Sequence, residues 1–241
     1  RLATTRGTNA LLTGAIAPTA FVINRGLGDL LRIGTQQRPD LFALDIQRPR
    51  PLHAAVIEVD GRLDACGREI AALNLDSVAR DARESLARGI RDAAVCLLHA
   101  DLNPAHEEAI ARVLLDTGFE RITCSSHVAP FVKILPRATT AMVNAGLAPV
   151  ISGYLTGVRR ALRAPGSSLL VMTSAGGLST AAEFLPKDSL LSGPAAGVVG
   201  AAAAAQAAGF AHAVSFDMGG TSTDAARWSH ATGIEDVFEH T

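Results

Sequence analysis

The middle of the chain alternates helical and extended patterns, and this alternation constrains the fold more than any other feature. From Asp76 to Ala93 an apolar residue recurs at every fourth position, which predicts an amphipathic helix. The apolar run "AAVCLLHA" follows and predicts a buried strand. The next stretch, "PAHEEAIARVLLDTGF", predicts a second helix with Asn103 as its N-cap and Pro104 as its first residue. This alternation indicates an α/β fold.

A second α/β unit is predicted in the C-terminal half. It begins with the long helix "TTAMVNAGLAPVISGYLTGVRRALRA", which contains Pro149, and continues with the strand "SLLVMTS" and the loop "AGGLST". A Gly/Ala-rich helix follows, "LLSGPAAGVVGAAAAAQAAGF", with Gly193 and Pro194 near its start. Small residues there allow a neighbouring helix or a ligand to approach the backbone closely.

Shorter patterns describe the N-terminal part. Thr8 is a plausible N-cap for a short helix over Asn9–Leu12 that ends at Gly14. The segment "HAAVIEVDGRLD" predicts a β-hairpin with Asp60-Gly61 as its turn. Between them, Thr35–Leu52 is rich in proline and arginine, and we expect it to be loop.

Composition excludes several classes of protein. With 48% hydrophobic and 19% charged residues, the 241-residue chain can build a packed core, and a net charge of −1 gives no attraction to nucleic acid or acidic lipid. No uninterrupted apolar run reaches the roughly 20 residues that span a bilayer, so no membrane partner is expected. The three cysteines form no C-x-x-C pair, which favours neither zinc nor a disulfide scaffold. These features favour a cytoplasmic location, although the chain starts without Met, and we expect a fragment of a longer protein.

The stretch "SFDMGGTSTDAARW", Ser215–Trp228, is the candidate ligand-binding motif. Two strands flank a turn in which Gly219-Gly220 permits positive φ and lets backbone N–H groups face an incoming phosphate. Thr221–Thr223 add hydroxyl donors, and Asp217 can hold a hydrated magnesium ion. An ordinary hairpin turn has the same composition, so on the residues alone both interpretations stay open.

Three other motifs could be functional, but each also has a simpler structural interpretation or departs from the functional pattern. The turn "SAGGL", with Gly176 and Gly177, is a substrate contact or a tight turn without a ligand. "SGPAAG", Ser192–Gly197, is a ligand contact or a face for helix packing. "MTSAG" approaches the serine-hydrolase motif G-x-S-x-G, but Met172 stands where the first glycine belongs, which argues against that chemistry.

Taken together and in their order, these motifs closely resemble the ATP-dependent hydantoinase/oxoprolinase family. The resemblance is carried by "TTAMVNAGLAPVISGYL", "LLVMTSAGGLSTAAEF", "LLSGPAAGVVGA" and "FDMGGTSTDAARW". The N-terminal "TTRGTNALL", "NRGLGDLLRIGTQQRPDLFAL" and "LNPAHEEAIARVL" resemble the family as well, and "GIEDVFEHT" and "IGTQQRPDLFALDI" are nearest to its 5-oxoprolinase branch.

The resemblance implies an α/β actin-like ATPase fold, a duplicated ribonuclease-H-like core with nucleotide between two lobes, present here as an incomplete fragment. Residues 1–135 would form the N-terminal region of the family, without its first phosphate loop. Residues 136–241 would begin the hydantoinase A region, with the connecting helix Ser192–Ala201 and the second phosphate hairpin.

The implied activity is ATP-dependent opening of a cyclic amide. The leading reaction is hydrolysis of 5-oxo-L-proline to L-glutamate while ATP is cleaved to ADP and phosphate. The alternatives are a hydantoin or N-methylhydantoin hydrolase, the ATPase subunit of a ketone carboxylase, and a non-catalytic ATP-binding protein of the same fold. ATP, Mg2+ and K+ are the expected cofactors, and the expected partners are a hydantoinase B-like subunit or domain and further copies of the chain.

The resemblance also assigns roles to residues. Catalytic roles fall to Asp217, which would also bind the metal, and to Asp224. The residues expected to hold ATP are Gly219, Gly220, Thr221, Ser222, Thr223, Ser192 and Gly193. Weaker, substrate-side assignments are Thr5, Asn9, Gly176 and Gly177. Two departures leave the substrate open: Thr13 replaces an acidic residue of the family's first helix, and "ILPRA" replaces an E-Y-E-R-type run.

Overall fold

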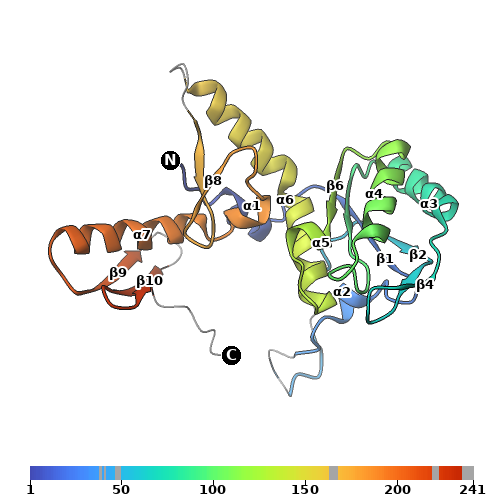
Figure 1. Cartoon of the computed structure of the whole chain (residues 1–241), viewed down its shortest axis with the longest axis horizontal. Helices are drawn as coiled ribbons and strands as arrows, with labels where there is room; N and C mark the ends of the chain where they lie inside the picture. The colour runs from blue at the N-terminus through green and yellow to red at the C-terminus, as the bar shows by residue number, and fades with distance from the viewer. Residues whose placement is uncertain (38–39, 41, 47–49, 163–167, 219–222, 235–241) are drawn as a thin grey trace. The chain divides into compact units, whose positions relative to one another are not determined.

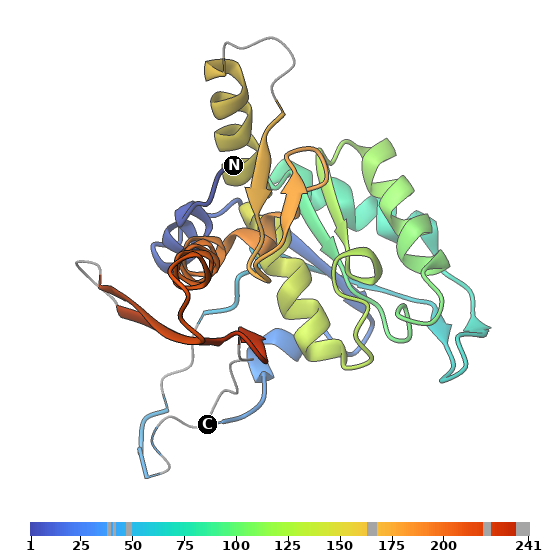
Figure 2. The same cartoon turned by 60° about the vertical axis from the view of Figure 1, so that its left-hand side comes forward.

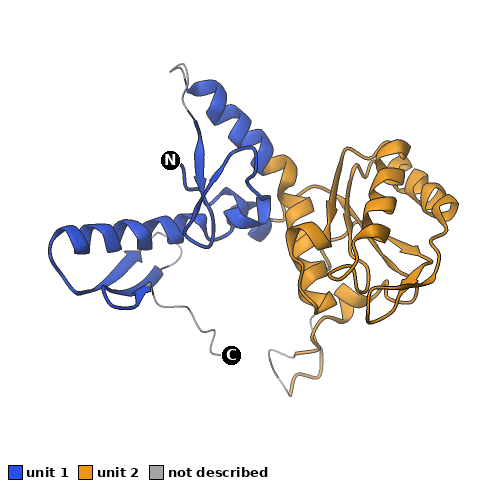
Figure 3. Ribbon diagram, in the orientation of Figure 1, with its two compact units in different colours: residues 1–13, 151–241 blue, residues 14–150 orange. Residues whose placement is uncertain are grey.

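The chain forms two units in the computed structural model, which describes residues 1–37, 40, 42–46, 50–162, 168–218 and 223–234 (Figure 1). Unit 1 combines residues 1–13 with residues 151–241, and unit 2 comprises residues 14–150 (Figure 3). The N-terminal segment therefore belongs to the same unit as the C-terminal half. The division of the sequence into an N-terminal family region, residues 1–135, and the start of a hydantoinase A region, residues 136–241, stays a prediction.

A parallel sheet forms the centre of unit 2 (Figure 1). Its spatial order is β2-β1-β5-β6, and each neighbouring pair is parallel. The strands are β1 (Thr19–Asn24), β2 (Ala55–Val59), β5 (Asp92–Val95) and β6 (Arg121–Cys124). The predicted α/β alternation is thereby confirmed, since parallel neighbours need helical crossovers between them.

The helices α3 (Leu75–Ala87) and α4 (Ala105–Thr117) cover one face of this sheet. Val78 and Ala82 of α3 are buried against the sheet, as their spacing predicted. The side chain of Asn74 caps α3 by accepting a hydrogen bond from the Ser77 N–H at 3.1 Å.

The first part of helix α6 (Ile134–Ala161) covers the other face, together with α2 (Leu30–Ile33) and α5 (Ser125–Val128). Small side chains on α6 let it pack closely on the strands, and Pro149 lies within the helix as predicted. By length and composition α6 would suffice to cross a membrane, but half of its most apolar window is buried inside the protein. That burial is typical of a core helix.

The hairpin predicted for "HAAVIEVDGRLD" is wrong. Asp60-Gly61 does not close a hairpin, because β2 pairs in parallel with β1, and β3 (Arg62–Leu63) pairs instead with β4 (Glu69–Ala71). Long-range contacts hold the turn: Asp60 forms an ion pair with Arg25, and the Gly61 carbonyl accepts a hydrogen bond from the Asn24 side chain.

Helix starts were also misplaced. The first helix begins at Arg6 with Thr5 as its N-cap, three residues earlier than Asn9. The helix α4 begins at Ala105 rather than Pro104, and the Asn103 side chain accepts the Ala105 N–H at 3.1 Å. Helix ends depend on tertiary packing that local signals do not carry.

Unit 1 is built around the Gly/Ala-rich helix. A three-stranded antiparallel sheet of order β11-β10-β9 packs beside this helix, α7, and a separate hairpin pairs β7 with β8 (Figure 2). The elements are α1 (Arg6–Leu12), β7 (Leu170–Met172), β8 (Leu178–Thr180), the 3-10 helix η1 (Pro186–Ser189), α7 (Ser192–Ala207), β9 (His212–Met218), β10 (Thr223–Ser229) and β11 (Gly233–Ile234).

The cysteines give a first test of this fold. Burial raises the pKa of Cys96 and of Cys124 to about 12, whereas Cys66 is exposed. Because only the thiolate reacts, iodoacetamide at pH 7.5 should label Cys66 and leave the other two unmodified until the protein unfolds. Peptide mass mapping before and after urea denaturation measures this. Equal labelling of all three cysteines in the native protein would contradict the described core.

Candidate functional site

The hairpin of β9 and β10 brings two carboxylates together. Asp217 of β9 lies directly opposite Asp224 of β10 in the antiparallel register. Residues opposite one another share one face of a sheet, with Cβ atoms about 4.5–5.5 Å apart. Like charges so placed destabilise the pair unless a cation lies between them. The turn residues Gly219, Gly220, Thr221 and Ser222 lie outside the described residues, and Thr223 starts β10 with an exposed side chain.

Both carboxylates lie on the side of the hairpin that faces α7. Asp217 Oδ2 is 3.9 Å from the position that a Cβ on Gly197 of α7 would take. Ala213 and Ser215, on the same face as Asp217, are half-buried. The missing side chain at position 197 leaves open space beside the carboxylate.

The first turn of α7 contacts the N-terminal segment of the chain. The Ser192 hydroxyl is buried and accepts a hydrogen bond from the Thr4 N–H at 3.4 Å. The Thr5 methyl carbon lies 3.0 Å from the position of a Cβ on Gly193. Unit 1 therefore brings Thr5 beside Gly193, whereas Asn9 is exposed further along α1.

The β7–β8 turn is fixed to the same end of α7. The Ser174 hydroxyl donates to the Asp188 carbonyl at 2.8 Å and accepts the Leu191 N–H at 3.0 Å. Gly176 has a φ of +82° and approaches the side chain of Val199 of α7, and the Gly177 carbonyl accepts the Thr173 N–H at 2.8 Å. The two glycines are thus turn residues placed next to the helix, with no ligand needed to explain them.

The arrangement around α7 supplies two kinds of group that a nucleotide phosphate needs. The N-cap residue Leu191 provides no side-chain cap, and among the described residues no acceptor binds the N–H groups of Ser192 and Gly193. Free amides at a helix start attract anions. Within the described residues no cluster of three or more His, Cys, Asp or Glu side chains could hold a metal, so two carboxylates would need phosphate and water ligands, as Mg2+ commonly does.

Replacing the glycines of α7 with alanine tests this packing. Gly193→Ala places a Cβ 3.0 Å from Thr5, whereas Gly200→Ala meets nothing within 4 Å. We expect Gly200→Ala to raise the free energy of unfolding by up to about 1 kcal/mol through helix propensity, and Gly193→Ala to lower it. Thermal unfolding of both variants measures the difference. If both substitutions stabilise equally, the Thr5 side chain does not pack against the start of α7.

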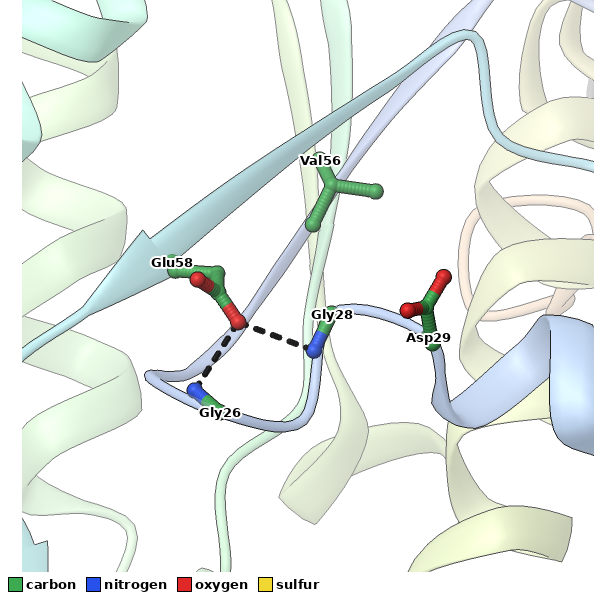
Figure 4. Close-up of a pocket in the computed structure, with 5 residues that line it drawn as sticks. All are labelled: Gly26, Gly28, Asp29, Val56 and Glu58. Atoms are coloured by element: carbon green, nitrogen blue, oxygen red, sulfur yellow. Dashed lines mark hydrogen bonds between the residues drawn. The ribbon is translucent and has the colours of Figure 1, made fainter.

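Unit 2 contains a pocket that the sequence patterns did not predict (Figure 4). Its volume is about 450 Å³, and its described lining comprises Gly26, Gly28, Asp29, Val56 and Glu58. Val56 and Glu58 alternate along the edge strand β2 and therefore project to one face. The Glu58 Oε1 atom accepts the N–H groups of Gly26 at 2.9 Å and Gly28 at 3.0 Å.

Two carboxylates, Asp29 and Glu58, belong to the described lining of this pocket. Arg25 forms an ion pair with Asp60, in which hydrogen bonding and the opposite charge keep the pKa of Asp60 below its usual value, and the charge of Glu58 contributes to the raised pKa of Arg25. Burial lowers the pKa of His53, which stacks on Phe21, and the nearby charge of Asp29 opposes that shift. The signal in the sequence is the pair of glycines in "NRGLGD" after a strand, but its partner Glu58 lies 30 residues away.

Family profiles match two parts of the chain. Residues 1–118 match the profile of the hydantoinase/oxoprolinase N-terminal region, and residues 137–236 match that of hydantoinase/oxoprolinase. Both halves thus point to the same family.

Curated relatives match over the whole chain. The chain is 36% identical to 5-oxoprolinase 1 of Arabidopsis thaliana over 99% of its length and 33% identical to 5-oxoprolinase of Saccharomyces cerevisiae over 99%. It spans about a fifth of the length of these relatives, 20% and 21% respectively.

Two solved structures share the fold. Nucleotide-free acetone carboxylase superposes with a TM-score of 0.82 at 23% identity, and the ATP-dependent caprolactamase of Pseudomonas jessenii with 0.80 at 24%. Each match covers 93% of this chain and 34% of the other. The expected α/β, actin-like ATPase fold class is confirmed. With both family profiles matched, the chain belongs to the hydantoinase/oxoprolinase family.

Proposed function

We propose that the protein carrying this chain couples ATP cleavage to hydrolysis of a cyclic amide, with 5-oxo-L-proline as the substrate. The observation that carries the proposal is the pairing of Asp217 with Asp224 on the side of the hairpin that faces α7. The identity of 33–36% to two 5-oxoprolinases supports the choice of substrate.

In this proposal the groups around α7 hold the nucleotide phosphates. Asp217 and Asp224 would share a hydrated Mg2+ ion, which neutralises phosphate charge when bound. The amides of Ser192 and Gly193 would face phosphate oxygens at the start of α7. Gly219, Gly220, Thr221, Ser222 and Thr223 keep their predicted role as the phosphate-binding turn.

The proposed chemistry activates an amide carbon that is otherwise inert. The terminal phosphoryl group of ATP passes to the amide oxygen, and water then attacks the ring carbon. The ring C–N bond breaks and the nitrogen takes a proton, which leaves an acyl phosphate on the opened chain. A second water hydrolyses this acyl phosphate, so that glutamate, ADP and phosphate are the products. Thr5, Asn9, Gly176 and Gly177 are the proposed substrate-side residues, since the segment just before α1 and the β7–β8 turn both form hydrogen bonds at the start of α7.

The proposed activity requires further residues beyond these 241. Because the chain spans about a fifth of the 5-oxoprolinases it matches, we propose that a hydantoinase B-like domain or subunit completes the enzyme. A cytoplasmic location, a homo-oligomeric state and dependence on K+ belong to the same proposal.

The decisive experiment compares substrates in the full-length protein with Mg2+ and ATP. Phosphate release and glutamate formation are measured with 5-oxoproline, hydantoin and N-methylhydantoin. Glutamate formed in proportion to phosphate supports the proposal. Turnover of a hydantoin without glutamate formation would replace it with a hydantoinase, and nucleotide binding without stimulated ATP cleavage would identify a non-catalytic protein.

A further inference from the structure

Arg6 and the chain's single tyrosine form a cation–π pair in unit 1. The Arg6 guanidinium carbon lies 4.8 Å from the centre of the Tyr154 ring. Arg6 is the first residue of α1, and Tyr154 lies on α6. An aromatic face attracts a guanidinium and limits its rotation while leaving its N–H edge open.

The backbone around Arg6 is anchored to the candidate site. The Arg6 N–H donates to the Thr4 hydroxyl at 3.1 Å, and the Thr4 N–H donates to Ser192 at 3.4 Å. Between them, Thr5 contacts Gly193. The arginine is therefore attached to the same short segment that lies against the first turn of α7.

The charge of Arg6 is not neutralised within the described part of the chain. Its side chain is exposed, and no described carboxylate forms an ion pair with it, unlike Arg25, Arg121 and Arg137. The start of a helix is also the end at which backbone dipoles disfavour a cation. The positive charge of Arg6 therefore does not stabilise α1.

We propose that Arg6, held by Tyr154, is a specificity-determining residue that binds an oxyanion at the substrate side of this site. A planar guanidinium presents two parallel N–H donors that match a carboxylate or a phosphate. Two sources supply such a group: the carboxylate of the cyclic amide and a phosphate of ATP. The identity of these ligands rests on the proposed function.

The test uses the full-length protein and two lactams that differ only in the carboxylate. ATP-dependent phosphate release is measured with 5-oxoproline and with 2-pyrrolidinone, and the Kd of Mg-ATP is measured by calorimetry. If Arg6 binds the substrate carboxylate, Arg6→Gln raises the KM for 5-oxoproline about 10- to 100-fold and spares 2-pyrrolidinone and Mg-ATP. If it binds phosphate, the Kd of Mg-ATP rises by a similar factor and both lactams are affected.

Matched variants separate recognition from folding. Arg6→Lys should recover part of the affinity, and Tyr154→Leu should weaken binding more than Tyr154→Phe because only leucine removes the ring. Arg160→Gln is the control: it removes an exposed arginine of α6, the helix that carries Tyr154. It should change neither the KM for 5-oxoproline nor the Kd of Mg-ATP. Thermal unfolding confirms that each variant is folded.

Failure of this inference is distinguishable from failure of the proposed function. If the wild type cleaves no cyclic amide, the proposed function fails, and direct titration of 5-oxoproline and Mg-ATP into wild type and Arg6→Gln still tests the arginine. Equal affinity of both proteins for both ligands would overturn the assignment of Arg6.

Discussion

Asp217→Asn is expected to reduce ATP cleavage by the full-length protein by about 100-fold or more. The substitution keeps the size of the side chain and removes its charge, so that Mg2+ loses one of the two carboxylates that the hairpin places opposite one another. Asp224→Asn should lower activity as well, because it removes the second of the two carboxylates proposed to share the ion. Steady-state phosphate release at saturating Mg-ATP and substrate measures both effects.

Stability separates this loss from simple unfolding. Opposed carboxylates repel across a strand pair, so Asp217→Asn should leave the melting temperature unchanged or raise it slightly while activity falls. Glu183→Gln is the matched control, since Glu183 is an exposed acid of unit 1 whose carboxylate accepts a hydrogen bond from the Thr180 hydroxyl. Its activity should stay within about twofold of wild type. If Asp217→Asn kept wild-type activity, the hairpin would have no role in binding Mg2+ and would be an ordinary turn.

Local patterns predicted the layers of the fold because helical and strand periodicity is a local property. The spacing from Val78 to Ala82 predicted the buried side of α3, and the run after it predicted β5. The partner of β2 was not predictable in the same way. Asp60-Gly61 fits a hairpin turn, yet the neighbour of β2 is β1, more than 30 residues earlier in the chain.

The candidate site was predictable only where its parts are close in sequence. Asp217 and Asp224 flank one predicted turn, and the register of the hairpin places them opposite one another. The contact between Thr5 and Gly193 joins residues 188 positions apart, and neither motif contains a signal that predicts contact with the other. The pocket at Glu58 was not predicted for the same reason: the Glu58 carboxylate accepts hydrogen bonds from the N–H groups of Gly26 and Gly28, which lie about 30 residues earlier in the chain.

A buried polar network accounts for the shape of the loop that follows β5. Glu107 is fully buried, and its two oxygens accept four hydrogen bonds. The donors are the Leu97 N–H, the Ser125 hydroxyl, and the N–H and hydroxyl of Ser126. Arg137, also fully buried, donates to the Leu97 carbonyl at 2.6 Å and lies 3.4 Å from Asp101. One carboxylate and one guanidinium thus fix both polar groups of the same peptide residue.

Glu107→Ala should therefore lower the local stability of unit 2 by about 3–5 kcal/mol, because two buried and two partly buried donors lose their acceptor at once. The measurement is hydrogen exchange, followed by mass spectrometry, of the peptide that contains β5 and Leu97. Since each 1.4 kcal/mol is about a factor of ten in an equilibrium, exchange from this peptide should accelerate by at least about 100-fold.

The neighbouring acid supplies the control for this prediction. Glu108→Gln alters an exposed side chain of the same helix, whose contact is His127 at 3.5 Å, and should change the opening free energy by no more than about 0.5 kcal/mol. Glu107→Gln keeps the shape but replaces one acceptor oxygen with a donor, so its effect should fall between the two. Unchanged protection in Glu107→Ala would show that the network does not hold the loop, and that hydrophobic packing of the sheet alone determines its position.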